Sequence, residues 1–99
     1  FIPVKQVVKA NIQACQSSQN GVFNVALGKS TTINQLLDTI KEVMGTDVDP
    51  IYLKSRAGDI KHSLANISQA KTFGFNPSPD YKDDLAETVE WFIKQKQCK

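Results

Sequence analysis

A β-type segment, an amphipathic helix and a second β-type segment follow one another in this chain, and this pattern limits the possible folds most. Val22–Ala26 combines β-branched and aromatic residues, which favour strands. Apolar residues then keep helical spacing over Ile33–Met44, and Gly45 ends the helix. Asp49–Leu53 reads as a second strand. Such an arrangement within about thirty residues is typical of a βαβ unit, so we expect two parallel strands with a right-handed crossover.

Three other segments have the spacing of helices. Apolar residues recur at every third or fourth position over Val4–Cys15, where Pro3 suits the first turn. We expect a short helix over Ile67–Thr72 and a final helix that begins near Asp80 and runs toward Lys94. The sequence therefore predicts an α/β fold with three to four helices, two or three short strands and one parallel βαβ unit. So few elements make a thin core, and we expect their apolar faces to need a surface from outside the chain.

Composition narrows the class of protein. With 99 residues, 40% hydrophobic and 22% charged, the chain is typical of one soluble globular domain or part of one. It has no apolar run near the ~20 residues that cross a bilayer and no signal-peptide pattern. Its first residue is Phe1, which we interpret as the mark of an excised segment. The lysines stand singly among acids, which argues against a nucleic-acid partner.

Residues for metal or catalytic chemistry are sparse. Cys15 and Cys98 lie far apart without ligand spacing, and His62 is the only histidine, so a zinc site would lack ligands. We expect Cys15 in the core and reduced thiols in a cytoplasmic protein, although a disulfide stays open. The sequence has neither a dinucleotide-binding glycine fingerprint nor a nucleophilic triad. We therefore expect no catalytic, cofactor-binding or metal residues in this chain.

The candidate binding residues lie in the loop after the second predicted strand. Arg56 is the only arginine, next to a glycine loop that also carries Asp59. Open α/β sheets bind their ligands at the carboxyl ends of parallel strands. A guanidinium suits a diphosphate, and a carboxylate can accept hydrogen bonds from ribose hydroxyls. A surface pair of Arg56 and Asp59 that shapes the loop is the alternative, and spacing alone favours it. His62 and Ser63 follow on the same stretch.

Several motifs match one enzyme family in order and spacing. They comprise Phe1–Asn11, the turn Phe23–Leu36, the run Arg56–Ala70, Gly74-Phe75 with Pro77, and the closing Leu85–Phe92. The run R-A-G-D-I-K-H-S-L-A-N-I-S-Q-A is the most specific of them. Over nearly its whole length, the chain resembles the carboxy-terminal part of extended short-chain dehydrogenases/reductases, specifically the NAD-dependent UDP-N-acetylglucosamine 4-epimerase family.

The resemblance implies that residues 1–99 are the C-terminal substrate-binding region of a UDP-sugar 4-epimerase. Its Rossmann domain, NAD and catalytic group would then lie outside this chain. Arg56 would contact the substrate diphosphate, Asp59 the ribose, and the small Ser63 would leave room for an N-acetyl group, with His62 beside them. The implied partners are a UDP-sugar of the UDP-GlcNAc/UDP-GalNAc type and the missing NAD-binding domain, with a homodimer as an option and no nucleic acid or membrane. Polysaccharide biosynthesis is the implied setting.

Two departures and two alternatives accompany this interpretation. Gln6 and Asn66 stand where the family usually has Asp. Asn66 can still cap a helix, whereas Gln6 replaces one partner of an expected buried ion pair. A nucleotide-sugar dehydratase or decarboxylase is the alternative within the family, and a non-catalytic binding or interaction module is the alternative outside it.

Overall fold

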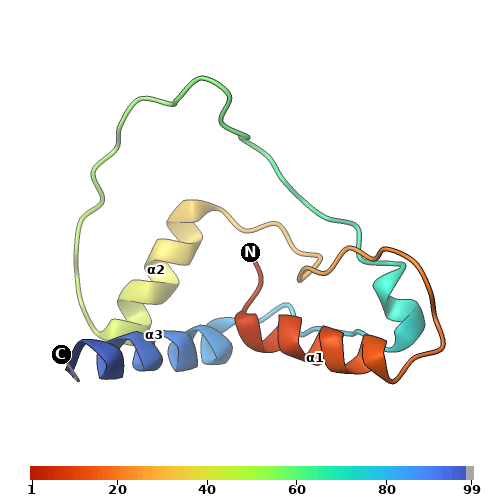
Figure 1. Ribbon diagram of the computed structural model, residues 1–99. Coiled ribbons are helices and arrows are strands. Elements are labelled where there is room, and N and C mark those ends of the chain that lie inside the picture. Colours follow the sequence, from red (N-terminus) through yellow and green to blue (C-terminus); the bar gives the residue numbers. More distant parts are fainter. Residues whose placement is uncertain (98–99) are drawn as a thin grey trace.

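The computed structural model describes residues 1–97. Its helices are α1 (Val4–Cys15), α2 (Ile33–Met44), the short 3-10 helix η1 (Ala70–Phe73) and α3 (Lys82–Gln97). Figure 1 shows α1 and α3 along one side of the molecule, with α2 rising from α3 and η1 beside the far end of α1. Within the described part, none of the helices has the length and apolar character needed to span a membrane.

The first two expected helices are confirmed over their full ranges. In α2, the hydroxyl of Thr32 accepts a hydrogen bond from the Gln35 N–H at 3.1 Å, and the Gln35 side chain accepts one from the Thr32 N–H at 2.9 Å. This reciprocal capping box satisfies two amide groups that a helix start otherwise leaves without partners. The amino end of α2 is therefore well fixed.

The final helix forms where it was expected, whereas the short helix is shifted. The final helix runs from Lys82 to Gln97, and Asp80 forms an Asx turn just before it: the Asp80 carboxylate accepts the Lys82 N–H at 3.1 Å. The short helix occupies Ala70–Phe73 instead of beginning at Ile67. Asn66 precedes it in an Asx turn and accepts the N–H two residues further on at 2.9 Å, which explains the later start.

The predicted α/β class is wrong for the described residues, since residues 1–97 contain no β-strand and no βαβ unit. Val22–Ala26 and Asp49–Leu53 have strand-forming composition but lie on opposite sides of the molecule (Figure 1). A strand exists only through hydrogen bonds to a neighbouring strand, and here neither segment has one. Val22, Ile51 and Leu53 are 92, 88 and 87% exposed, so these apolar side chains lack packing partners too.

A small apolar cluster holds α1 against η1. Ala10, Ile67, Ala70 and Phe75 are at most 7% exposed and pack together. Phe23 adds an edge-to-face contact with Phe73 at 5.2 Å between ring centroids. Cys15 is exposed, so its expected place in the core is wrong. The state of Cys98 lies outside the described residues.

The molecule is open in shape. Its radius of gyration is 16.3 Å, whereas a compact domain of this length has about 13 Å. The difference comes largely from the segment between α2 and η1, which Figure 1 shows as a long arc away from the helices. The four residues proposed from the sequence as a binding site all lie in this arc, which we call the Arg56 arc and define as residues 48–64.

Candidate binding site

The tip of the Arg56 arc is a tight turn closed twice by the same two residues. The Asp59 N–H donates to the Arg56 carbonyl oxygen at 3.2 Å, which is the standard bond of a four-residue turn. The Arg56 N–H donates to Asp59 Oδ2 at 3.1 Å. Gly58 is the third residue of the turn and has φ +88°, a conformation that other residues adopt only with strain. The sequence R-A-G-D therefore encodes this turn.

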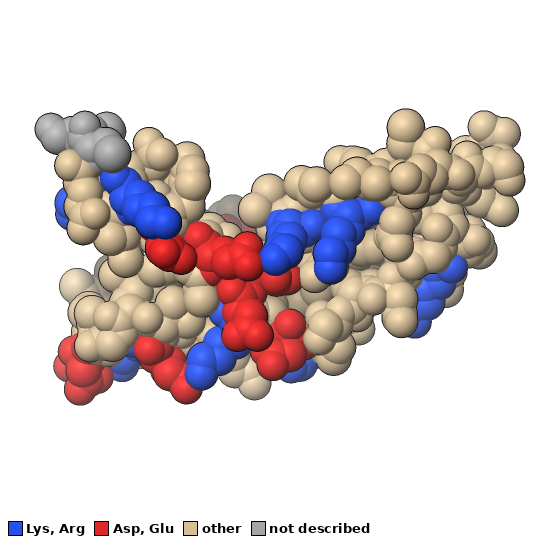
Figure 2. Space-filling model, turned by 90° about the horizontal axis from the view of Figure 1, so that it is seen from below, with Lys and Arg blue, Asp and Glu red and all other residues tan. Residues whose placement is uncertain are grey.

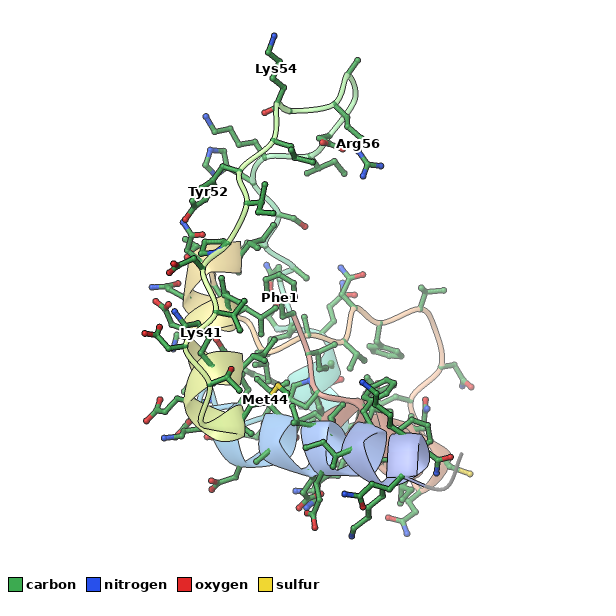
Figure 3. The ribbon with its side chains drawn as sticks, turned by 90° about the vertical axis from the view of Figure 1, so that its left-hand side faces the viewer. Phe1, Lys41, Met44, Tyr52, Lys54 and Arg56 are labelled. Carbon is green, nitrogen blue, oxygen red and sulfur yellow. The ribbon has the colours of Figure 1, made fainter. Side chains whose placement is uncertain are left out.

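The guanidinium of Arg56 is not used by the turn. Asp59 contacts the backbone of Arg56, and none of the ion pairs within 4.0 Å among residues 1–97 includes the Arg56 side chain. Figure 3 shows Arg56 and Lys54 projecting from the far end of the arc. Of the alternatives drawn from the sequence, a side-chain pair with Asp59 is not formed, although Asp59 does shape the loop.

Positive charge is concentrated at this turn. The stretch Lys54–His62 contains three of the chain's 12 lysine and arginine side chains, Lys54, Arg56 and Lys61, and one of its 10 carboxylates. The rest of the chain then holds equal numbers of both signs, so the net charge of +2 belongs to this stretch. An exposed turn of this kind attracts anions.

Figure 2 shows the opposite character on another face, where acidic side chains form a central band between lysines. On the helices, Lys5 Nζ lies 2.9 Å from Glu87 and Lys82 Nζ lies 2.6 Å from Glu42. The hydrogen bond and the charge of Glu87 raise the pKa of Lys5, and those of Glu42 raise the pKa of Lys82. The positive charges of these two lysines are therefore balanced by adjacent carboxylates, whereas the Arg56 guanidinium has no such partner among residues 1–97.

His62 and Ser63 lie on the arm of the arc that returns to the core. Both are exposed, as are Arg56 and Asp59. The structure thus places all four proposed residues in one arc but does not enclose them in a pocket. We call the helices α1, α2, η1 and α3 together the helical body. Two grooves on it are lined by other residues, one of about 470 Å³ beside the start of α2 and one of about 220 Å³ between the chain start and α3.

One contact of the arc could not be read from the sequence. The hydroxyl of Tyr52 donates to Asn34 Oδ1 at 3.3 Å and so joins the arc to the first turn of α2. The two residues are 18 positions apart, and neither belongs to a motif that marks such a bond.

Residues 1–97 do not form a binding site for NAD. The five glycines of the chain occur singly, without the G-x-G-x-x-G spacing that lets a backbone approach a pyrophosphate. Residues 1–97 also lack the strand-to-helix turn on which that fingerprint is built. In the same range, no three His, Cys, Asp or Glu side chains are grouped to hold a metal ion.

Solved structures match this geometry closely. The chain superposes with a TM-score of 0.88 on the UDP-N-acetylglucosamine 4-epimerase from Methanobrevibacter ruminantium M1, solved in complex with UDP-N-acetylmuramic acid. The two are 53% identical, and the match covers 96% of this chain and 31% of that one. The chain is homologous to one part of the UDP-sugar 4-epimerases. No family model matches it.

Other epimerases agree with this assignment. The UDP-glucose 4-epimerase from Thermotoga maritima, solved with UDP-glucose, matches with a TM-score of 0.84 and 38% identity over 96% of this chain and 31% of its own. A putative UDP-glucose 4-epimerase from Methanocaldococcus jannaschii is 34% identical over 91 residues, which are 92% of this chain and 30% of that protein. The chain therefore spans about 30% of the length of these relatives.

Proposed function

We propose that this chain is the substrate-binding portion of an NAD-dependent UDP-sugar 4-epimerase that interconverts UDP-N-acetylglucosamine and UDP-N-acetylgalactosamine. The match to the Methanobrevibacter ruminantium enzyme carries the proposal, because 53% identity over 96% of the chain accompanies the same backbone arrangement. The chain on its own turns over no substrate. It supplies contacts to the nucleotide, and the rest of the enzyme supplies the reaction centre.

Arg56 is the proposed diphosphate ligand. Its guanidinium has no carboxylate partner within residues 1–97, and it stands in the stretch that carries the net positive charge of the chain. A planar fork of donors can form two parallel hydrogen bonds to phosphate oxygens, which a lysine cannot do. Its exposure in this structure agrees with a site whose other wall comes from the remaining part of the enzyme.

The other three residues would surround the nucleoside and the sugar. One oxygen of Asp59 is held by the Arg56 N–H, and its second oxygen remains to accept a ribose hydroxyl. Ser63, four residues further along the arc, is small enough to admit an N-acetyl group. His62 would line the same wall. In this arrangement, the segment anchors the nucleotide through contacts that do not change during the reaction, which orients the sugar.

NAD supplies the hydride chemistry of this reaction when bound, and residues outside 1–97 would hold it. Exposed apolar side chains of the Arg56 arc support the presence of a further domain that packs against this chain. Ile51, Leu53 and Ile60 are each at least 82% exposed here, and a partner surface from the same enzyme would cover them.

Product analysis tests the proposal. The complete protein is incubated with NAD and UDP-N-acetylglucosamine, and the nucleotide sugars are separated by chromatography. Formation of UDP-N-acetylgalactosamine supports the epimerase. A 4-keto-6-deoxy sugar would identify a dehydratase, release of CO₂ from a UDP-uronic acid would identify a decarboxylase, and no conversion of any nucleotide sugar would identify a binding module.

A further inference from the structure

The Arg56 arc is held to the helical body at widely spaced points. On its early side, the Thr46 N–H donates to the Lys41 carbonyl oxygen at 3.1 Å as α2 ends. On its late side, the chain re-enters the core at Ile67, which is 7% exposed. Every residue from 48 to 64 is exposed. Without a further contact, a span of about twenty residues could place its tip in many positions.

Tyr52 provides that further contact. Within residues 1–97, the hydrogen bond from Tyr52 Oη to Asn34 Oδ1 at 3.3 Å is the one hydrogen bond that joins residues 48–64 to the helical body. Asn34 directly follows the first residue of α2, inside the capping box that fixes this helix start. In Figure 3, Tyr52 lies between α2 and the tip that carries Lys54 and Arg56. The bond therefore ties the arc to a rigid element.

Chain reach shows why this contact matters for Arg56. The four residues from Tyr52 to Arg56 span at most about 14 Å when extended, whereas the ten residues from Thr46 allow about 35 Å. Beyond Arg56, the turn is already rigid, because Arg56 and Asp59 close it twice. A fixed Tyr52 thus limits where the whole turn, with its guanidinium, can lie.

We infer that Tyr52 and Asn34 position the Arg56 turn for a nucleoside diphosphate without touching that ligand. The inference rests on the proposed function of Arg56. It predicts that loss of the tether weakens the binding of ligands that carry the diphosphate and spares ligands that lack it. It also predicts that the tether matters only while Arg56 is present.

The test uses the complete enzyme with NAD bound and measures Kd for UDP and for uridine by calorimetry. Tyr52→Phe, which removes only the hydroxyl, should weaken UDP about threefold to tenfold and leave uridine unchanged. Asn34→Ala should reproduce this loss, and the double variant should lose no more than either single one. Tyr81→Phe is the matched control, because none of the hydrogen bonds formed among residues 1–97 uses the Tyr81 hydroxyl, and it should bind both ligands normally.

Arg56→Ala provides the deciding background. If the tether acts through Arg56, adding Tyr52→Phe to Arg56→Ala causes no further loss of UDP affinity. An equal loss for UDP and uridine, a full further loss in the Arg56→Ala background, or unchanged UDP binding in Tyr52→Phe would each overturn the inference. If Arg56→Ala itself binds UDP normally, the proposed role of Arg56 fails, and the inference fails with it. If Tyr52→Phe binds UDP normally and Arg56→Ala binds it weakly, the positioning role of Tyr52 is contradicted and the proposed role of Arg56 stands.

Discussion

Gln6 on α1 donates a hydrogen bond from Nε2 to Asp84 Oδ2 on α3 at 2.8 Å, which joins two helices that are 78 positions apart in the sequence. Gln6 is 8% exposed and Asp84 is partly buried. Gln6 therefore suits its neighbour better than the Asp that the family resemblance leads one to expect at this position, since a carboxylate facing Asp84 would be repelled by it.

Replacement of Gln6 by Asp should destabilise the protein at neutral pH. Two carboxylates in contact raise the pKa of one of them in the folded state above its unfolded value, so the loss is present at high pH and shrinks as pH falls through that raised pKa. We expect about 1–3 kcal/mol at pH 7. Thermal unfolding from pH 7 to pH 4 measures it, with Gln6→Ala as the control that loses the hydrogen bond without adding a charge and should therefore be destabilised less at pH 7. A pH-independent deficit in Gln6→Asp would contradict the contact.

Gly28 should tolerate no side chain, because of both its backbone and its neighbour. Its φ is +71°, and an added Cβ would lie 3.0 Å from Cδ1 of the buried Ile67. Gly45 is the matched control, with φ +65° and no atom within 4 Å of an added Cβ. We expect Gly45→Ala to cost about 1–2 kcal/mol from the backbone alone and Gly28→Ala to cost more. Equal losses in a denaturant titration would mean that the Ile67 side chain simply moves aside.

Asp59 should have two separable roles. Asp59→Asn keeps an oxygen for the Arg56 N–H but places an amide donor where the second carboxylate oxygen would accept a ribose hydroxyl. We expect about a tenfold loss of UDP affinity in Asp59→Asn and a larger loss in Asp59→Ala, which also opens the turn. Calorimetric titration with UDP decides this. Normal UDP binding in Asp59→Asn would mean that Asp59 only stabilises the turn and does not contact the ribose.

The size of residue 63 should select the sugar. Ser63→Tyr fills the space proposed for the N-acetyl group, so we expect at least about a tenfold drop in kcat/KM for UDP-N-acetylglucosamine with UDP-glucose spared. Ser63→Ala keeps the space and serves as the control. Parallel losses for both sugars in Ser63→Tyr would place residue 63 away from the hexose.

Helix positions could be predicted from the sequence because they depend on local information. The apolar spacing of Val4–Cys15 and Ile33–Met44 and the hydroxyl of Thr32 act within a few residues, and both helices form as expected. The two β-type segments were wrong as strands for the opposite reason. Val22–Ala26 and Asp49–Leu53 have suitable composition, but a strand also needs a partner, and the described residues bring none to either.

In the candidate site, too, local features could be predicted from the sequence and contacts between distant residues could not. The R-A-G-D sequence indicates a turn, and residues 56–59 form one. The sequence could not show that Asp59 bonds the amide of Arg56 instead of its guanidinium, because both pairings fit the spacing. It also could not indicate the bond from Tyr52 to Asn34, which depends on how α2 lies beside the arc. Contacts of this kind are set by packing and not by motif.

The central claim is that the single guanidinium of this chain binds the diphosphate of a UDP-sugar. It is tested most directly by kcat/KM of the complete enzyme with UDP-N-acetylglucosamine for Arg56→Ala and Arg56→Lys, with Lys54→Ala as a control for loss of one charge at the same tip. We expect Arg56→Ala to lose about 2–4 kcal/mol, roughly 30- to 1000-fold, Arg56→Lys to lose less, and Lys54→Ala to lose least. An unchanged kcat/KM in Arg56→Ala would contradict the account.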